Sequence, residues 1–195
     1  MTVHVFTYRC WLAGMLLCLA VAQVRAEDQV EQAPGFDVVS ARSTLVGDVV
    51  RLDALFDLRL SDNLIEALQN GISLNLVIKI QILKERDYLW ASTVTTLEQR
   101  YLIYYRPLTG HYVLDNLNSQ VVFQFPSLEA LLAVASVLSD FPLLDYSLLD
   151  PDARYLGEIH IEVDRDSFPV PLRLMSYVYG DWHLSSEWFS WPLLP

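Results

Sequence analysis

The sequence predicts a mainly β fold, an antiparallel β-sandwich or a highly curved sheet of about eight strands with two short amphipathic helices. Apolar and polar residues alternate along several stretches, which is typical of strands that bury one face and expose the other. Only two segments have helical periodicity, whereas a parallel sheet needs a helix between most of its strands. The 195 residues are 53% hydrophobic and 12% aromatic, a composition that excludes intrinsic disorder and suffices for a core.

The first 26 residues have the three regions of a secretory signal peptide. Residues 1–9 are polar and end in a positive charge, residues 10–22 (CWLAGMLLCLAVA) are apolar, and Val24-Arg25-Ala26 precedes acidic residues. The apolar run is shorter than the roughly 20 residues that span a bilayer, so we expect cleavage after Ala26 and a periplasmic location. An uncleaved membrane anchor and lipidation at Cys18 are the alternatives.

Cleavage would change the chemical character of the chain. It would remove both cysteines, Cys10 and Cys18, together with two arginines, so that the net charge would change from −11 to −13. The remaining chain would form no disulfide and no cysteine-ligated metal site. The acidity of the sequence, with a pI near 4.6, excludes nucleic acid as a partner because phosphate binding requires basic residues. We expect membrane contact only through the signal segment, if that segment is retained.

Two regions are expected after the signal. Residues 27–35 (EDQVEQAPG) are polar and end in Pro-Gly, which is typical of a flexible leader, and residues 36–195 follow as a single antiparallel β-rich domain. Alternation and β-rich composition predict strands over residues 36–45, 50–58, 74–82, 94–106, 112–114, 120–125 and 158–164. Gly47-Asp48 predicts a tight turn between the first two strands, and the DNLNS segment at 115–119 predicts a hairpin loop.

Two segments have helical character. Ser61 is a good N-cap for a helix that the Asn70-Gly71 pair would end. Ser127 caps a second apolar run, and we expect this second helix to end near Asp140. Residues 140–153 (DFPLLDYSLLDPDA) then predict a long, packed connection. Such connections often carry function, and a lid over one end of a sandwich is the alternative.

Histidines and carboxylates offer candidates for chemistry but no complete motif. His111, His160 and His183 lack the i, i+4 spacing and the cysteine partners of a zinc site, and neither acidic tripeptide beside the last predicted strand resembles a calcium loop. Residues 183–187 contain the residue types of a hydrolase triad without a G-x-S-x-G elbow. We therefore assign no catalytic residue, no metal ligand and no cofactor.

The tryptophan-rich C-terminal segment is the most unusual local feature of the sequence. One interpretation is an exposed aromatic platform for a glycan, a peptide or a membrane edge. The other is a terminal strand that packs its indoles into the core. His160 adds a pH-sensitive candidate, because Glu158 and Glu162 on either side favour its charged form, with a solvated histidine as the alternative. The candidate binding residues are Trp182, Ser185, Glu187, Trp188, Trp191 and His160.

Several segments together resemble a known bacterial family. They are residues 60–61, 66–68 and 70–72, the FPSLEAL run at 125–131, the FPVPL run at 168–172, and the most specific of them, DWHLSSEWFSWPL at 181–193. This combination resembles the bacterial family of "domain of unknown function 4390". The resemblance implies an exported proteobacterial protein with no catalytic residues to carry over. It also implies gene neighbours that connect such proteins with envelope signalling.

The expected function is a non-enzymatic binding or accessory module in the periplasm, with an unknown protein partner in the cell envelope. Two alternatives remain. A structural protein that contacts lipid or cell wall through its C-terminal aromatics would expose its tryptophans as one patch. A hydrolase with an Asp/His/Ser site would place His160 or His183 in a cleft beside a carboxylate.

Overall fold

The computed structural model describes residues 33–86, 91–171, 173–174 and 182–194. The predicted signal peptide, most of the predicted leader and Trp90 lie outside these residues. The strands are β1 (Gly35–Val46), β2 (Val49–Arg59), β3 (Leu74–Lys84), β4 (Ser92–Arg106), β5 (His111–Asn116), β6 (Val121–Phe125), β7 (Val137–Asp145), β8 (Tyr155–Val163) and β9 (Phe189–Pro192). Between them lie the helices α2 (Asp62–Gln69) and α3 (Leu128–Ala135) and the 3₁₀ turns η1 (Tyr146–Leu148) and η2 (Arg165–Ser167). In this part of the chain, no helix has the length and apolarity that crossing a membrane requires.

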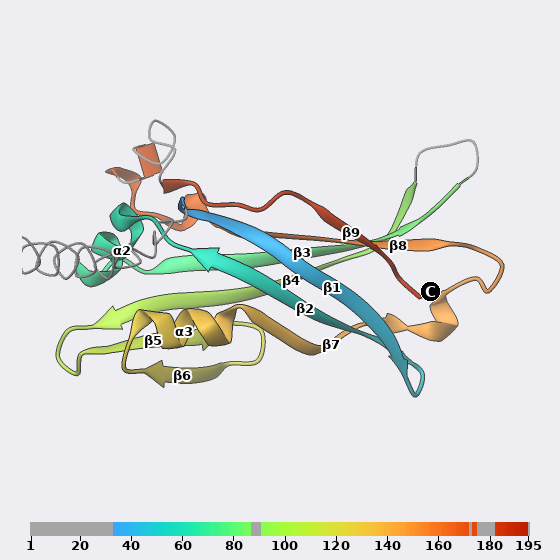
Figure 1. Cartoon of the computed structure of the whole chain (residues 1–195), viewed down its shortest axis with the longest axis horizontal. Coiled ribbons are helices and arrows are strands. Elements are labelled where there is room, and N and C mark those ends of the chain that lie inside the picture. The colour runs from blue at the N-terminus through green and yellow to red at the C-terminus, as the bar shows by residue number, and fades with distance from the viewer. Residues whose placement is uncertain (1–32, 87–90, 172, 175–181, 195) are drawn as a thin grey trace, which may run out of the picture. The chain divides into compact units, whose positions relative to one another are not determined.

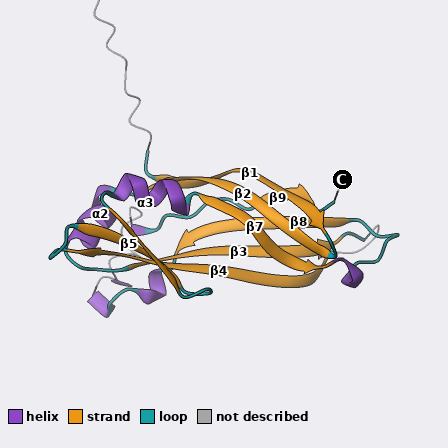
Figure 2. Cartoon of the chain, turned by 90° about the horizontal axis from the view of Figure 1, so that it is seen from below, coloured by secondary structure: helices purple, strands orange, loops and turns teal. Residues whose placement is uncertain are grey.

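The strands form two antiparallel sheets, which confirms the predicted β-sandwich. The small sheet has the order β1-β2-β7, and the large sheet has the order β6-β5-β4-β3-β8-β9. Figure 2 shows the small sheet as one layer above β3 and β4 of the large sheet. Each sheet therefore has one face against the other sheet and one face turned away from it, as the alternating sequence pattern requires.

The core lies between the two sheets and is built from alternate residues of predicted strands. The inward-pointing residues of β3 are all buried: Leu74, Leu76, Ile78, Ile80 and Ile82. On β8, Ile159 lies opposite Ile80 and Ile161 lies opposite Ile78, and both are fully buried. The alternation in these two strands therefore predicted correctly which face points into the core.

Both predicted helix starts are confirmed. The Ser61 hydroxyl accepts a hydrogen bond from the amide of Leu64, and the Ser127 hydroxyl accepts one from the amide of Ala130. Each serine satisfies a backbone donor that the first turn of a helix leaves free. After α2, Gly71 has a φ of 84°, which glycine adopts at little cost, so the helix ends where Asn70-Gly71 predicts.

The end of α3 and the connection after it differ from the prediction. The helix ends at Ala135 rather than near Asp140, and the next residues form β7, which pairs with β2. Asp140 has a φ of 54° and Pro142 lies within the strand, so the sequence here does not look like a strand. β7 tolerates both because it is an edge strand with two register shifts, where a residue without an N–H disrupts no second ladder. The predicted long connection is therefore reduced to residues 146–154.

The two open sides of the sandwich are covered in different ways. On one side, β9 pairs with β8 in the large sheet and also contacts β1 in the small sheet. On the other side, α3 packs against β5, β6 and β7, and Figure 1 shows it between β7 and the β5–β6 hairpin. The C-terminal strand therefore links the two sheets and leads the tail to the end of the sandwich where β3 ends and β8 begins.

Candidate functional site

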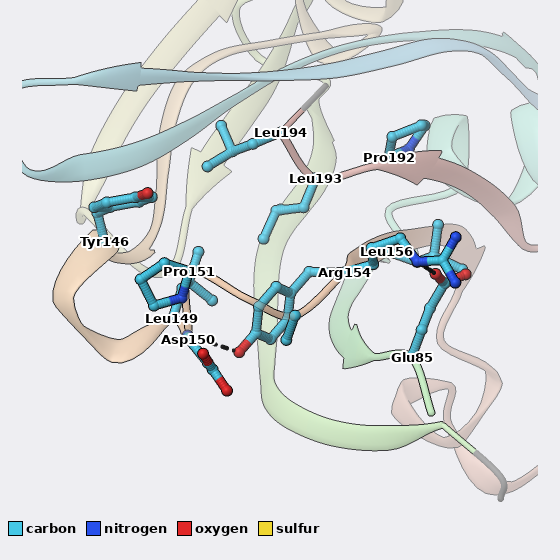
Figure 3. A pocket seen from close by; sticks show the side chains of 12 residues that line it. Glu85, Tyr146, Leu149, Asp150, Pro151, Arg154, Leu156, Pro192, Leu193 and Leu194 are labelled. Carbon is cyan, nitrogen blue, oxygen red and sulfur yellow. Dashed lines mark hydrogen bonds and ion pairs between the residues drawn. The ribbon is translucent and has the colours of Figure 1, made fainter. Parts of the chain in front are cut away.

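A pocket of about 540 Å³ opens at one end of the sandwich, and we refer to it as the end pocket. Its walls come from Glu85 after β3, from residues 146–156 around the start of β8, and from residues 192–194 of the C-terminal tail. Figure 3 shows these side chains around the pocket. The three segments converge because the start of β8 pairs with β3 on one side and with β9 on the other.

The walls of the end pocket combine apolar side chains with the charged groups of Glu85, Asp150 and Arg154. Leu149 and Leu193 are buried, and Leu156 and Leu194 are partly exposed. Tyr146 adds an exposed ring from η1. A concave site of this size that offers both apolar and polar groups is a candidate binding site for a small molecule or for a few side chains of a partner.

The charged groups around the end pocket are paired with one another. Lys84 lies 3.1 Å from Asp150, and Arg154 lies 3.4 Å from Glu85. The amide of Asp150 donates a hydrogen bond of 2.9 Å to the Tyr155 hydroxyl, which Figure 3 marks. The hydrogen bond from Lys84 lowers the pKa of the Asp150 carboxyl, so this group is charged at neutral pH. These contacts attach the connection after η1, residues 149–154, to the sheet.

His160, a predicted site residue, lies beneath Trp188 on the face of β8 that points away from the core. The two rings stack with their centroids 5.0 Å apart and their planes 23° apart, and the His160 side chain is only 12% exposed. Its Nε2 atom lies 3.2 Å from a carboxylate oxygen of Glu162. Its buried Nδ1 atom has no hydrogen-bond partner within the described part of the chain. The fold thus brings together two predicted residues that lie far apart in the sequence.

Glu162 connects His160 to the neighbouring strand. Its carboxylate accepts a hydrogen bond of 2.6 Å from Lys79 of β3. Burial is the largest influence on Glu162 and raises its pKa, but the hydrogen bonds and charges of Lys79 and His160 outweigh it, so the pKa lies below its ordinary value. A carboxylate that is held in its charged form fits the role of a partner in a salt-bridged network. It fits the role of a general base less well, because such a base needs a pKa near neutral pH.

The residues that suggested a triad attach the C-terminal segment to β8. Ser186 is buried, and its hydroxyl donates to the carbonyl of Glu187 at 2.8 Å and accepts from the amide of Ile161 at 3.1 Å. His183 has a buried Nδ1 atom with no partner among the residues that the structure describes. Burial and, after it, the charge of Arg165 lower the pKa of His183, so the ring is neutral at pH 7.

The three C-terminal tryptophans have different environments. Trp191 is 4% exposed and belongs to the core, Trp182 is partly buried, and Trp188 is 43% exposed. The Trp182 ring meets Phe168 edge-on with centroids 5.9 Å apart. In this fold the three indoles therefore do not form one contiguous exposed platform. Trp191 instead packs into the core.

The other predicted residues flank the same segment. Ser185 forms an isolated β-bridge with β8, and Glu187 is exposed. Neither residue lines the end pocket, and the prediction did not include pocket residues such as Tyr146 and Tyr155. Residues 140–153 are rich in apolar residues, prolines and aspartates, and this composition indicated a packed connection. The composition did not single out an individual residue.

A known protein family matches this chain. The family is described as "Domain of unknown function (DUF4390)", and the match extends over residues 33–192. No curated protein and no solved structure matches the chain. The matched residues include both sheets, the helices α2 and α3, and the walls of the end pocket as far as Pro192. Because the match covers far more than half of the sequence, the chain belongs to the DUF4390 family.

Proposed function

We propose that the protein is exported to the periplasm and acts there as a non-enzymatic binding or accessory module. Its end pocket accepts an apolar side chain or short apolar segment of a protein partner in the cell envelope. The observation that carries this proposal is the pocket of about 540 Å³ between the connection after η1 and the C-terminal tail. The gene neighbourhood that the family resemblance implies favours an envelope signalling protein as the partner.

The chemistry of the end pocket suits an apolar group. The ionic groups around it already form the pairs Lys84–Asp150 and Glu85–Arg154, so a charged ligand would have to displace existing partners. The exposed Tyr146 ring and the partly exposed Leu156 and Leu194 would lose contact with water when an apolar group enters the pocket, which favours binding. A net charge of −11 further favours a partner surface that is neutral or basic around this group.

The polar groups of the C-terminal segment support a role without catalysis. The Ser186 hydroxyl is engaged in two hydrogen bonds, and Trp188 covers the ring of His160. Glu162 is held in its charged form by Lys79. A hydrolytic site needs a nucleophile whose hydroxyl is free to react, whereas the Ser186 hydroxyl is already engaged by the Ile161 amide and the Glu187 carbonyl.

Site-specific photocrosslinking in living bacteria tests the binding proposal. A benzophenone amino acid replaces Ala153, which lines the end pocket, and for comparison Leu108, which is fully exposed at the opposite end of the large sheet. We expect a discrete crosslinked envelope protein from position 153 and none from position 108. The same adduct from both positions, or no adduct from position 153 at native expression levels, would refute the proposal.

A variant that fills the end pocket provides the matched control. Ala153→Trp inserts an indole among the pocket walls, whereas Ala130→Trp adds the same group to a partly exposed position of α3. We expect Ala153→Trp to abolish capture of the crosslinked partner by the purified protein, and Ala130→Trp to retain it. Turnover of an ester or peptide substrate that depends on His160 would instead favour the hydrolase.

Identifying the first residue of the protein recovered from cells tests export separately from binding. We expect the protein recovered from the periplasmic fraction to begin at Glu27, as intact-mass measurement can establish. A mass that includes residues 1–26 in a membrane fraction would show retention of the signal as an anchor, and a cytoplasmic protein of full mass would contradict export.

A further inference from the structure

The edge strand β6 presents an apolar surface that the fold leaves open. β6 ends the large sheet, and among the described elements β5 is the strand with which it pairs. Val121, Val122 and Phe123 are each close to half exposed. Figure 1 shows β6 at the lower border of the drawing, with its free side turned away from α3 and β5. A strand with one free side offers a row of backbone donors and acceptors to another chain.

The other sheet edges carry features that discourage such pairing. β7 contains Pro142 and two register shifts, and β9 is four residues long and ends in Pro192. β1 has a register shift at Val38/Ser40, and it contacts β8 and β9 on the side where the sandwich closes. Prolines, bulges and short strands are the usual protection of an edge. The sequence of β6, VVFQF, contains no proline, and its pairing with β5 has no register shift.

The absence of charge around β6 indicates which kind of partner can pair with it. The segment 116–128 contains no charged residue, in a chain whose net charge is −11. A basic or acidic partner segment would find no complementary group on this strand. A second copy of the chain would be repelled through most surfaces, but two neutral β6 strands can meet without bringing like charges together.

We propose that β6 pairs antiparallel with β6 of a second copy, about a two-fold axis at Phe123. This register places Phe123 opposite Phe123 of the second copy, and Val121 opposite Phe125. Phe123 lies opposite the buried Leu114 on β5, so these side chains share the face of the sheet that points toward the core. Aromatic pairs and aromatic–valine pairs at opposed positions are favourable across strands. The result is one continuous sheet through both copies.

The small size of the contact makes this association weak and dependent on concentration. Strands of five residues bury a limited area, which is typical of transient complexes. Because the two copies carry the same negative net charge, salt screens their repulsion, and we expect tighter association at higher ionic strength. An association driven by opposite charges would weaken under the same conditions.

Sedimentation velocity on the full protein as the cell produces it tests this proposal. We expect a monomer–dimer equilibrium that shifts toward the dimer as protein and salt concentrations rise. Phe123→Lys places two ammonium groups opposite each other at the axis and should weaken the dimer about tenfold or more. Val39→Lys on β1 is the control, because it adds the same charge to a more exposed position of another edge strand, and it should leave the dimer intact.

Two further measurements keep the test valid if Phe123→Lys folds poorly. Mixing Phe123→Lys with Phe123→Glu should restore a heterodimer, because opposite charges then meet at the axis. In the wild type, hydrogen exchange at the amides of Val121–Phe125 should slow as the protein concentration rises. A monomer at every soluble concentration, or a dimer that neither Phe123 variant weakens, would overturn the proposal.

Discussion

The indole Nε1 of Trp191 donates a hydrogen bond of 3.0 Å to the hydroxyl of Ser43, a residue 148 positions earlier in the chain. The Ser43 hydroxyl in turn donates to the carbonyl of Leu193. Ser43 belongs to β1 of the small sheet, whereas Trp191 belongs to β9 of the large sheet. One buried hydroxyl therefore joins the two layers and attaches the tail that forms a wall of the end pocket.

Removal of this hydroxyl should weaken the whole domain. In Ser43→Ala, the Trp191 N–H and the Leu193 carbonyl lose their shared partner inside the core, and we expect a loss of about 1–3 kcal/mol in the free energy of unfolding. Urea denaturation monitored by circular dichroism measures this loss. Ser40→Ala, at an exposed position of the same strand, should change the stability by less than about 0.5 kcal/mol. Equal effects of the two variants would contradict the role of the Ser43 contact.

Gly157 on β8 should not tolerate a side chain. A Cβ atom at this position would overlap the six-membered ring of Trp191, its partner across the β8–β9 pair. We expect Gly157→Ala to destabilise the protein by about 1–3 kcal/mol, since overpacking forces a shift of neighbouring groups. Gly35→Ala is the control, because a Cβ at Gly35 would meet only ordinary contacts.

A double-mutant cycle tests the mechanism of this clash. Trp191→Phe removes the ring atoms that the new Cβ would meet, so the cost of Gly157→Ala should fall by about 1 kcal/mol or more in the Trp191→Phe background. Additive effects of the two substitutions would show that the clash with Trp191 does not cause the loss.

Tyr155→Phe should loosen one wall of the end pocket. The substitution removes the acceptor of the Asp150 amide hydrogen bond while the ring remains in place. We expect faster cleavage by a broad-specificity protease within residues 146–154, mapped by mass spectrometry, and a loss of about 1 kcal/mol in stability. Tyr112→Phe, on β5 at the other end of the large sheet, should leave this cleavage pattern unchanged. Identical proteolysis of the wild type and Tyr155→Phe would contradict the proposed attachment.

His183 should make the protein less stable in mild acid. Burial lowers the pKa of His183 in the folded state below its ordinary value of 6.5, so the unfolded chain binds the proton more readily. The stabilisation is complete above pH 6.5 and is lost as the pH falls through the lower folded pKa. Denaturation at pH 7.5 and 5.5 should therefore show a smaller loss of stability in His183→Phe than in the wild type. An equal loss of stability between pH 7.5 and 5.5 in both proteins would show that His183 does not cause this pH dependence.

The strands and helix starts that the sequence predicted are those whose signals are local. Alternation in β3 and β8 reports which face is buried because successive side chains of a strand point to opposite sides. Ser61 and Ser127 cap their helices through amides three residues away. β7 was missed because Asp140 and Pro142 are unfavourable in a strand unless it lies at an edge with register shifts, and edge position is a property of the assembled sheet.

The sequence alone determined the fold class, the inward-facing residues of the central strands and, through its C-terminal motif, the family. Only the tertiary structure decided the surfaces. The end pocket requires Glu85, the connection after η1 and the tail to meet, and the exposed side of β6 follows from its place at the end of the sheet order. The stacking of His160 beneath Trp188 depends on the pairing of β9 with β8. Alternation and capping act between residues a few positions apart, whereas pockets and edges arise from contacts between distant segments, which no local pattern encodes.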